Sequence, residues 1–197
     1  MHTKPVLSAS VTGVVLAGGR GLRMNGRDKG LIERDGRTLA ERQLEHLRRQ
    51  TGALIISANR NLDRYRAMGV PVVADAQSDG HGPFAGPLAG MLSALRAAHT
   101  PWIACLPCDT LGTPADLVRR LLDGATAAGA RAAYAVDAHS PQYAVCLLHV
   151  DLADALDATL RTNQRAVHAF LSAQHAVAVD FADCAFENLN TPEMLAC

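Results

Sequence analysis

Short apolar runs alternate with amphipathic segments along almost all of this sequence. The apolar runs have the length of buried strands, and the segments between them carry the spacing of helices. Strands are expected at residues 12–19, 53–59, 70–75, 101–109, 132–137, 142–149 and 176–181. Helices are expected at 39–50, 62–68, 88–98, from 113 onward, 151–160, 165–173 and from 191 onward. Asp35-Gly36 predicts a turn between two short extended pieces, and Thr38 with Glu41 predicts a capping box at the start of the first helix. Thr113 and Pro114 predict the cap and first turn of the helix that begins there. The alternation predicts an α/β fold with a doubly wound, mostly parallel sheet.

The length and composition limit the classes of protein that fit. The 197 residues suit a single domain, so we expect a flexible tail at residues 1–10 and a folded domain at 11–197. The 19 basic and 19 acidic residues cancel, which argues against a nucleic-acid-binding domain. No apolar run approaches the roughly 20 residues that cross a bilayer, and no signal peptide is evident. With five cysteines, an odd number, a reducing cytoplasmic location is expected.

The segment GVVLAGGRGLRMNGRDKG, residues 13–30, runs from an apolar strand into a loop rich in glycine and cations. Two common phosphate-binding patterns do not match it. The dinucleotide fingerprint, started at Gly19 and Gly21, requires a third glycine where Met24 stands. The P-loop pattern, started at Gly21, requires Lys and then Ser or Thr, where Arg27 and Asp28 stand. The loop therefore belongs to another class.

This loop nevertheless has the chemistry of an anion site. Gly18, Gly19 and Gly21 let a ligand approach the backbone closely, and successive amides of this kind bind anions. Arg23 and Lys29 add full positive charges, the first able to grip a phosphate through two hydrogen bonds. A tight turn with two solvated cations is the alternative interpretation.

Two aspartates are expected at neighbouring strand ends. In a doubly wound sheet, ligands bind beyond the carboxyl ends of the strands. Asp109 follows an apolar strand and is suited to Mg²⁺, which prefers oxygen ligands and substrate phosphates; capping of the next helix is the alternative. Asp75 has a similar position, with a plain turn as its alternative. A glycine-rich stretch at residues 78–90 also falls at this edge.

Cys105 and Cys108 form a C-x-x-C pair, which can be a redox pair or half of a zinc site. A structural zinc site requires four ligands, and no second pair follows. Since Cys105 lies inside an apolar strand, we interpret it as a small buried packing residue. A redox or nucleotide-binding module without catalysis stays open as an alternative.

Four segments together resemble the molybdenum cofactor guanylyltransferases. They are LAGGRGLRMNGRDKG, GPLAGM, CLPCDT and ENLNTPEML, in this order. The first is shared with sugar-1-phosphate nucleotidylyltransferases, whereas all four in series are more specific. The resemblance spans about residues 12–195 and implies a single domain with a Rossmann-like sheet of the nucleotidyltransferase type, whose N-terminal half binds nucleotide and whose C-terminal half binds the acceptor.

The resemblance also implies roles for individual residues. Catalysis falls to Arg23, Lys29 and Asp109, with Mg²⁺ as cofactor on Asp109. Nucleotide contacts fall to Leu16, Ala17, Gly18, Gly19, Lys29, Ser57, Asn59, Asp75 and Asp109. Acceptor-side or supporting positions are Gly90, Asn188 and Asn190.

The sequence departs from the family pattern at three places. Asn25 replaces a glycine, although Asn also tolerates unusual backbone angles. Ser57 stands where relatives often have Asn, and Asn59 could take over that contact. The stretch at residues 78–90 is longer than usual.

The implied reaction is the transfer of GMP from GTP to molybdopterin, with release of pyrophosphate. Another acceptor or nucleotide, such as a sugar-1-phosphate or cytidylyl transfer, is the alternative. The resemblance implies GTP and molybdopterin as substrates, transient contact with cofactor-synthesis proteins and molybdoenzyme chaperones, and a cytoplasmic monomer without nucleic-acid or membrane partners.

Overall fold

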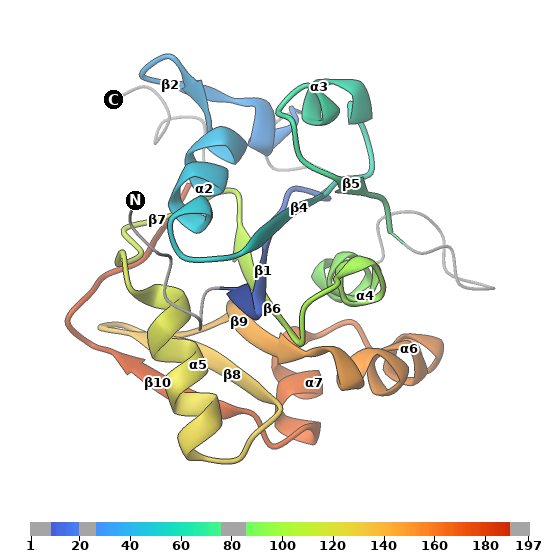
Figure 1. Ribbon diagram of the computed structural model, residues 1–197, viewed down its shortest axis with the longest axis vertical. Helices are drawn as coiled ribbons and strands as arrows, with labels where there is room; N and C mark the ends of the chain where they lie inside the picture. The colour runs from blue at the N-terminus through green and yellow to red at the C-terminus, as the bar shows by residue number, and fades with distance from the viewer. Residues whose placement is uncertain (1–8, 20–26, 76–85, 190–197) are drawn as a thin grey trace.

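One twisted seven-stranded sheet runs through the protein (Figure 1). The computed structural model describes residues 9–19, 27–75 and 86–189. The strand order is β10-β8-β9-β6-β1-β4-β5, and β9 runs antiparallel to its neighbours β6 and β8. The strands are β1 Val11–Leu16, β4 Ala53–Ser57, β5 Val72–Val73, β6 Trp102–Pro107, β8 Ala132–Asp137, β9 Pro141–His149 and β10 Val177–Phe181. The predicted mostly parallel sheet is confirmed.

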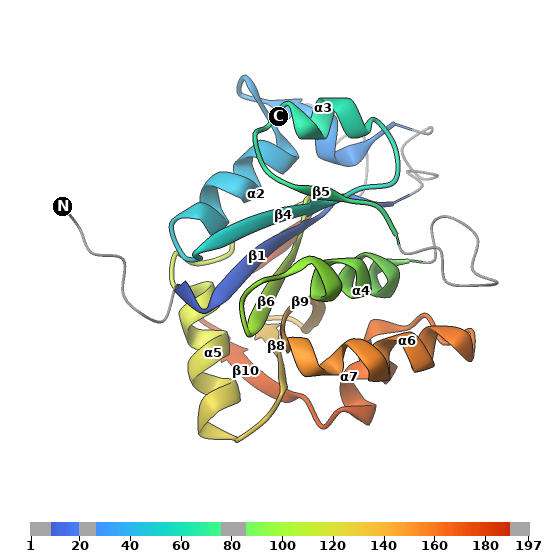
Figure 2. The same cartoon turned by 45° about the vertical axis from the view of Figure 1, so that its right-hand side comes forward.

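Helices cover both faces of this sheet, as a doubly wound fold requires. One face carries α2 Leu39–Arg48, α3 Leu62–Arg66 and α5 Leu117–Ala127. The other carries α4 Pro87–Ala97, α6 Ala153–Arg161 and α7 Val167–Ala173. In Figure 2, α2 and α3 lie on one side of the strands, at the top, and α4, α6 and α7 lie on the other side, at the right.

The central strand β1 shows why this sheet has two buried faces. Val11 and Val15 pack into the core beneath α2 and α5, whereas Val14 packs into the core beneath α4 and α6. Alternate residues of a strand point to opposite faces, so an apolar run without polar alternation is typical of a strand covered on both sides. A side chain at Gly13 would lie 3.0 Å from Leu47 and Thr51, so α2 approaches the strand closely here.

The hairpin before α2 agrees with its sequence signals. Strands β2 Glu33–Arg34 and β3 Arg37–Thr38 pair across Asp35 and Gly36, which have φ angles of 49° and 73°. Positive φ at both central residues is the type I′ geometry that Asp-Gly favours. Thr38 and Glu41 then form the expected capping box at the start of α2.

The start of α5 differs from the prediction. We expected Thr113 to cap this helix, with Pro114 in the first turn, but the helix begins at Leu117 and Asp116 holds the cap position. The Thr113 hydroxyl instead lies 3.2 Å from Nε2 of His46 on α2. A contact with another element therefore replaces the local cap.

Several short elements have no clear sequence signal. The 3₁₀ helix η2 Lys29–Leu31 precedes β2, and the 3₁₀ helix η3 Val150–Leu152 precedes α6. Strand β7 Thr110–Leu111 pairs antiparallel with β11 Glu187–Asn188 outside the main sheet. This small pair brings residues near the end of the chain next to the residue that follows Asp109. The helix expected from residue 191 lies outside the described residues.

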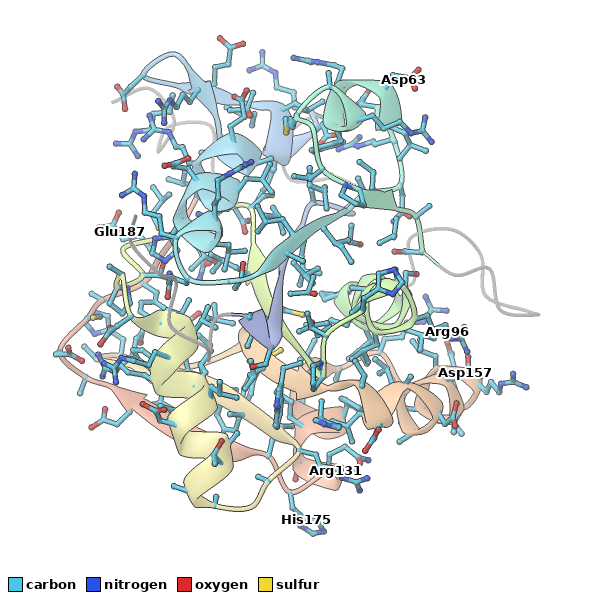
Figure 3. The ribbon with its side chains drawn as sticks, in the orientation of Figure 1. Asp63, Arg96, Arg131, Asp157, His175 and Glu187 are labelled. Carbon is cyan, nitrogen blue, oxygen red and sulfur yellow. The ribbon has the colours of Figure 1, made fainter. Side chains whose placement is uncertain are left out.

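An ion-pair cluster joins α4 to α6. The Asp157 carboxylate lies 3.3 Å from Arg96 on α4 and 2.9 Å from Arg161 on its own helix, and Figure 3 shows Arg96 and Asp157 next to each other. The Asp157 side chain is only 13% exposed, so the two guanidinium groups compensate a largely desolvated charge. The cluster thus connects α4 and α6 on the same face of the sheet.

Asp137 accepts several hydrogen bonds at the carboxyl end of β8. It ends β8, is 4% exposed, and accepts hydrogen bonds from the amides of His139, Ser140 and Phe186 at 2.8–3.0 Å. The Gln142 side chain donates a further bond at 3.0 Å. Burial opposes the charged form, but these bonds outweigh it and lower the pKa of Asp137.

We expect Asp137→Ala to reduce the free energy of unfolding by about 2–4 kcal/mol at pH 7, because four donors, including the buried Phe186 amide, lose their acceptor. A carboxyl whose pKa is lower in the folded chain stabilises it above the unfolded value, about 3.9, and loses this effect as the pH falls through the folded value. The deficit, measured by urea unfolding, should therefore shrink below about pH 4.

The exposed Asp154 on α6 provides the control for this prediction. Its replacement by Ala should change stability by less than about 0.5 kcal/mol. An Asp137→Ala deficit of the same size at pH 7 and in acid would show that the charged form is not what stabilises the fold.

Candidate active site

The carboxyl ends of four parallel strands, β1, β4, β5 and β6, meet at one edge of the sheet. The Ala17 amide donates to the Ser57 carbonyl at 2.8 Å, and the Cys108 amide donates to the Leu16 carbonyl at 3.0 Å. Ladder bonds thus continue past the ends of the strands. Because they occupy the Ala17 amide, the backbone donors that this loop can offer to an anion begin at Gly18.

Lys29 and Asp109 form an ion pair at this edge. Lys29 Nζ lies 2.8 Å from Oδ2 of Asp109, although the two residues are 80 positions apart. Their side chains are 21% and 19% exposed, so the pair is shielded on most sides and still reachable from solvent. The Asp109 carbonyl also accepts a bond from the Leu189 amide at 3.0 Å. The predicted phosphate-binding cation and the predicted metal-binding carboxylate are thus in direct contact.

Asn59 connects the first loop to the end of β5. Its Nδ2 donates to the Gly18 carbonyl at 3.2 Å, and its Oδ1 accepts from the Asp75 amide at 2.8 Å. Both ends of this side-chain amide therefore make bonds within the protein. Asn59 holds two of the predicted nucleotide-binding residues in place.

Three glycines create space around these residues. A side chain at Gly90 on α4 would collide with the Ser57 hydroxyl and lie 3.6 Å from Asp75 Oδ1. At Gly18 it would lie 2.9 Å from the Asn59 amide nitrogen and 3.8 Å from Asp75 Oδ1. At Gly19 the described part of the chain places nothing within 4 Å. Asp75 therefore lies between two bare backbones, whereas Ser57, only 1% exposed, lies beneath Gly90.

The β7–β11 pair places Asn188 beside this edge. The Thr110 hydroxyl donates to the Asn188 side-chain oxygen at 2.9 Å, and Asn188 Nδ2 lies 3.4 Å from Gln142 Oε1. The buried Gln43 of α2 donates to the Thr110 carbonyl. Asn188, predicted on the acceptor side, is thus held next to the residue after Asp109. Arg23, Asn190 and most of the 78–90 stretch lie outside the described residues.

The C-x-x-C cysteines do not face each other. Cys105 packs into the core beneath α4, and Cys108 packs into the core on the opposite face. Cys105 lies opposite Cys146 of β9, and a hydrogen bond between the two thiols, together with burial, raises the pKa of Cys105. Burial likewise raises the pKa of Cys108. This geometry supports their interpretation as packing residues.

A resident metal site of several protein ligands is absent from the described residues, where no three His, Cys, Asp or Glu side chains gather. None of the described helices has the length and apolarity required to span a bilayer. A carboxylate at a strand end, with substrate phosphates completing the shell, is a common arrangement for Mg²⁺, and Asp109 fits it.

Sequence reasoning missed Asp28. Its carboxylate accepts from Tyr65 and Asn61 and is nearly buried. An acidic residue directly before Lys29, within a basic segment, was the available signal.

Known proteins resemble this chain over nearly its whole length. Residues 13–178 match the MobA-like NTP transferase domain. A molybdenum cofactor guanylyltransferase from Burkholderia ambifaria is 46% identical over 195 residues, covering 96% of this chain and 95% of the relative. One from Serratia proteamaculans is 43% identical over 185 residues, covering 93% and 91%.

A solved structure shares the fold. It is the molybdopterin-guanine dinucleotide biosynthesis protein A of Archaeoglobus fulgidus, with a TM-score of 0.73, 21% identity, and coverage of 94% of this chain and 95% of the other. The family match over residues 13–178 and the 46% identical relative show that the chain belongs to the MobA-like NTP transferase domain family.

Proposed function

We propose that this protein transfers GMP from GTP to molybdopterin and releases pyrophosphate. The relatives that carry the guanylyltransferase name match it at 43–46% identity over nearly their full length. The single structural observation that carries the proposal is the Lys29–Asp109 pair beside the glycine loop, at the carboxyl edge of the sheet. An NTP transferase requires cations and a metal-binding carboxylate around the phosphates.

The nucleotide site uses the N-terminal half of the chain. The Gly18 and Gly19 amides and the Lys29 ammonium bind the phosphates, since bare backbone and a point charge both suit anions. Asp75 lies between Gly18 and Gly90, where it can accept hydrogen bonds from guanine or ribose. Leu16 and Ala17 form the start of this loop. Asn59 bonds the Gly18 carbonyl, and Ser57 lies buried beneath Gly90.

Asp109 is the residue that would hold Mg²⁺, since its carboxylate offers hard oxygen donors beside the phosphate-binding cation. Bound there, the ion supplies positive charge that stabilises the phosphate oxygens. Lys29 would exchange its contact with Asp109 for a contact with phosphate once the nucleotide arrives. The ion pair keeps both charges compensated until then.

The chemical step needs positioning more than proton transfer. A terminal phosphate oxygen of molybdopterin forms a bond to the α-phosphorus of GTP, and the bond from that phosphorus to the β-phosphate oxygen breaks. The nucleophile is already anionic, so no strong general base is required. Lys29, with Arg23, stabilises the charge that develops on the leaving pyrophosphate.

We assign the acceptor to the C-terminal half, where Asn188 and Asn190 would contact it, with Gly90 as a supporting position. The Asn188 side chain accepts a hydrogen bond from Thr110 and lies within hydrogen-bonding distance of Gln142. These two contacts fix the orientation of its amide group. We expect the enzyme to work as a cytoplasmic monomer that hands its product on through transient contacts with cofactor-synthesis proteins and molybdoenzyme chaperones.

Pyrophosphate release with GTP, CTP and UTP, each with and without molybdopterin and Mg²⁺, tests this function. We expect rapid release with GTP, molybdopterin and Mg²⁺ together, and about 100-fold slower release with CTP or UTP, because a site that hydrogen-bonds one base leaves polar groups unpaired with another. Faster turnover with CTP, or equal turnover with a sugar-1-phosphate in place of molybdopterin, would contradict the proposal.

A further inference from the structure

We propose that Asp28 is a positioning residue that fixes Lys29 in the site, and that Tyr65 and the segment Arg60-Asn61 hold Asp28 in place. This inference rests on the proposed function, because it concerns how Lys29 reaches the phosphates. Asp28 falls within the quoted segment LAGGRGLRMNGRDKG, but none of these four residues was among the site residues predicted from the sequence.

The Asp28 carboxylate is enclosed by donors. The Tyr65 hydroxyl donates to Oδ1 at 2.6 Å, and Asn61 Nδ2 donates to Oδ2 at 2.9 Å. Arg60 Nε lies 3.5 Å from Oδ2, and the Asp28 side chain is 6% exposed. A carboxylate this deeply buried is retained only when it is paired and hydrogen-bonded. These partners therefore fix the backbone of the residue that directly precedes Lys29.

Tyr65 makes the arrangement rigid. It is fully buried in α3, within the core beneath α2. Burial raises the pKa of the Tyr65 hydroxyl above its usual value, and the hydrogen bond to Asp28 raises it further. The hydroxyl therefore keeps its proton and remains a donor. A side chain at Gly30 would collide with this same hydroxyl and lie 3.2 Å from Ala17. Asp28 and Gly30, on either side of Lys29 in the chain, therefore both contact Tyr65, while the Lys29 side chain contacts Asp109.

The segment after β4 holds the backbone on both sides of the glycine loop. Asn59 bonds the Gly18 carbonyl, as described above. The next residue, Arg60, donates from Nη2 to the Arg27 carbonyl at 2.8 Å, and Asn61 then bonds Asp28. Three consecutive side chains therefore hold Gly18 and Lys29 at set positions. Both are groups that we assign to the phosphates.

This fixation matters because Lys29 carries a long, flexible side chain. Its four-carbon stem can reach many positions, so the location of its charge depends on a firm backbone. A displacement of about 1 Å in a group that stabilises a transition state can lower the rate by about 10²-fold. Asp28 has no contact of its own with the phosphates in this proposal and acts only through Lys29.

A double-mutant cycle in the full-length enzyme tests this. Asp28→Asn keeps the size of the side chain but replaces one acceptor oxygen by an NH₂ group, which would face the donors of Tyr65 or Asn61. This variant should lower kcat by roughly 10- to 100-fold. In the Lys29→Ala background the same change should alter kcat by less than about 2-fold, because the group it positions is gone. Asn61→Gly preserves the left-handed backbone at this position, with φ of 49°, and should show the same dependence on Lys29 with a smaller loss.

The matched control is Asp63→Asn on the same helix. The Asp63 side chain is 96% exposed and lies at the outer surface of α3 (Figure 3), so kcat and the unfolding midpoint should stay unchanged. Equal losses from Asp28→Asn with and without Lys29 would mean a merely structural role and overturn the inference, as would full activity of Asp28→Asn and Asn61→Gly. If Lys29→Ala itself retains full activity, the proposed function of Lys29 fails instead, and the two failures are distinguishable.

Discussion

Lys29→Ala should lower kcat for GMP transfer by roughly 10²- to 10³-fold, about 3–4 kcal/mol of barrier, while the chain still folds. The ammonium contacts Asp109 at a site that is only partly exposed, where one preorganised charge acts strongly on the developing pyrophosphate charge. KM for GTP should change less, because the glycine amides still bind phosphate. Steady-state kinetics with a pyrophosphate readout, together with thermal unfolding, measure both effects.

Lys29→Arg is the informative companion variant. Arg keeps the charge but spreads it over a planar group with a different reach, so it should recover only part of the lost rate.

The sequence contains two lysines, Lys4 and Lys29, so amine labelling followed by mass spectrometry reports on Lys29 with Lys4 as internal reference. Mg-GTP should protect Lys29 selectively. Native kcat in Lys29→Ala would remove this residue from the mechanism.

Asp109→Asn should reduce kcat/KM roughly 10³-fold, which corresponds to about 4 kcal/mol of barrier, and raise the Mg²⁺ concentration needed for half-maximal rate. The amide retains the size of the carboxylate but loses its charge, so it holds a hard divalent cation poorly. It also leaves Lys29 without its carboxylate partner. Titrating Mg²⁺ at saturating GTP measures the shift.

Asp123→Asn on α5 controls for the chemistry of the substitution. Asp123 is about half exposed and pairs with Arg119 on the surface, where such pairs contribute little. Its replacement should leave both the rate and the Mg²⁺ dependence unchanged. An Asp109→Asn enzyme with the native Mg²⁺ requirement would contradict the assignment of the metal to this carboxylate.

Local patterns in the sequence predicted the framework of the molecule. The apolar run in β1 predicted a strand covered on both faces, and Asp35-Gly36 with Thr38 and Glu41 predicted the hairpin and the start of α2. These signals depend on neighbouring residues alone, so they can be interpreted without knowledge of the fold. The rule that ligands bind at the carboxyl ends of parallel strands then brought Gly18 and Asp109 to one edge.

Contacts across long distances in the sequence could not be predicted in this way. Asp28 received no role from the sequence, because no local pattern shows that Tyr65, 37 positions later, donates to its carboxylate. The helix α5 begins at Leu117, and the Thr113 hydroxyl contacts His46, 67 positions earlier, instead of capping the helix. The bonds from the Asn59 side chain to Gly18 and Asp75 were likewise not predictable from neighbouring residues, and its contact with nucleotide stays a prediction.

The central claim is that a nucleoside triphosphate binds at this edge, with its phosphates between the Gly18–Gly19 backbone and Lys29 and its metal on Asp109. A crystal structure of the enzyme with Mg²⁺ and a non-hydrolysable GTP analogue measures this most directly. We predict phosphate oxygens within hydrogen-bonding distance of Lys29 Nζ and the Gly19 amide, and a metal ion bound to the Asp109 carboxylate. Phosphates bound elsewhere, with the Lys29–Asp109 pair still intact, would contradict the account.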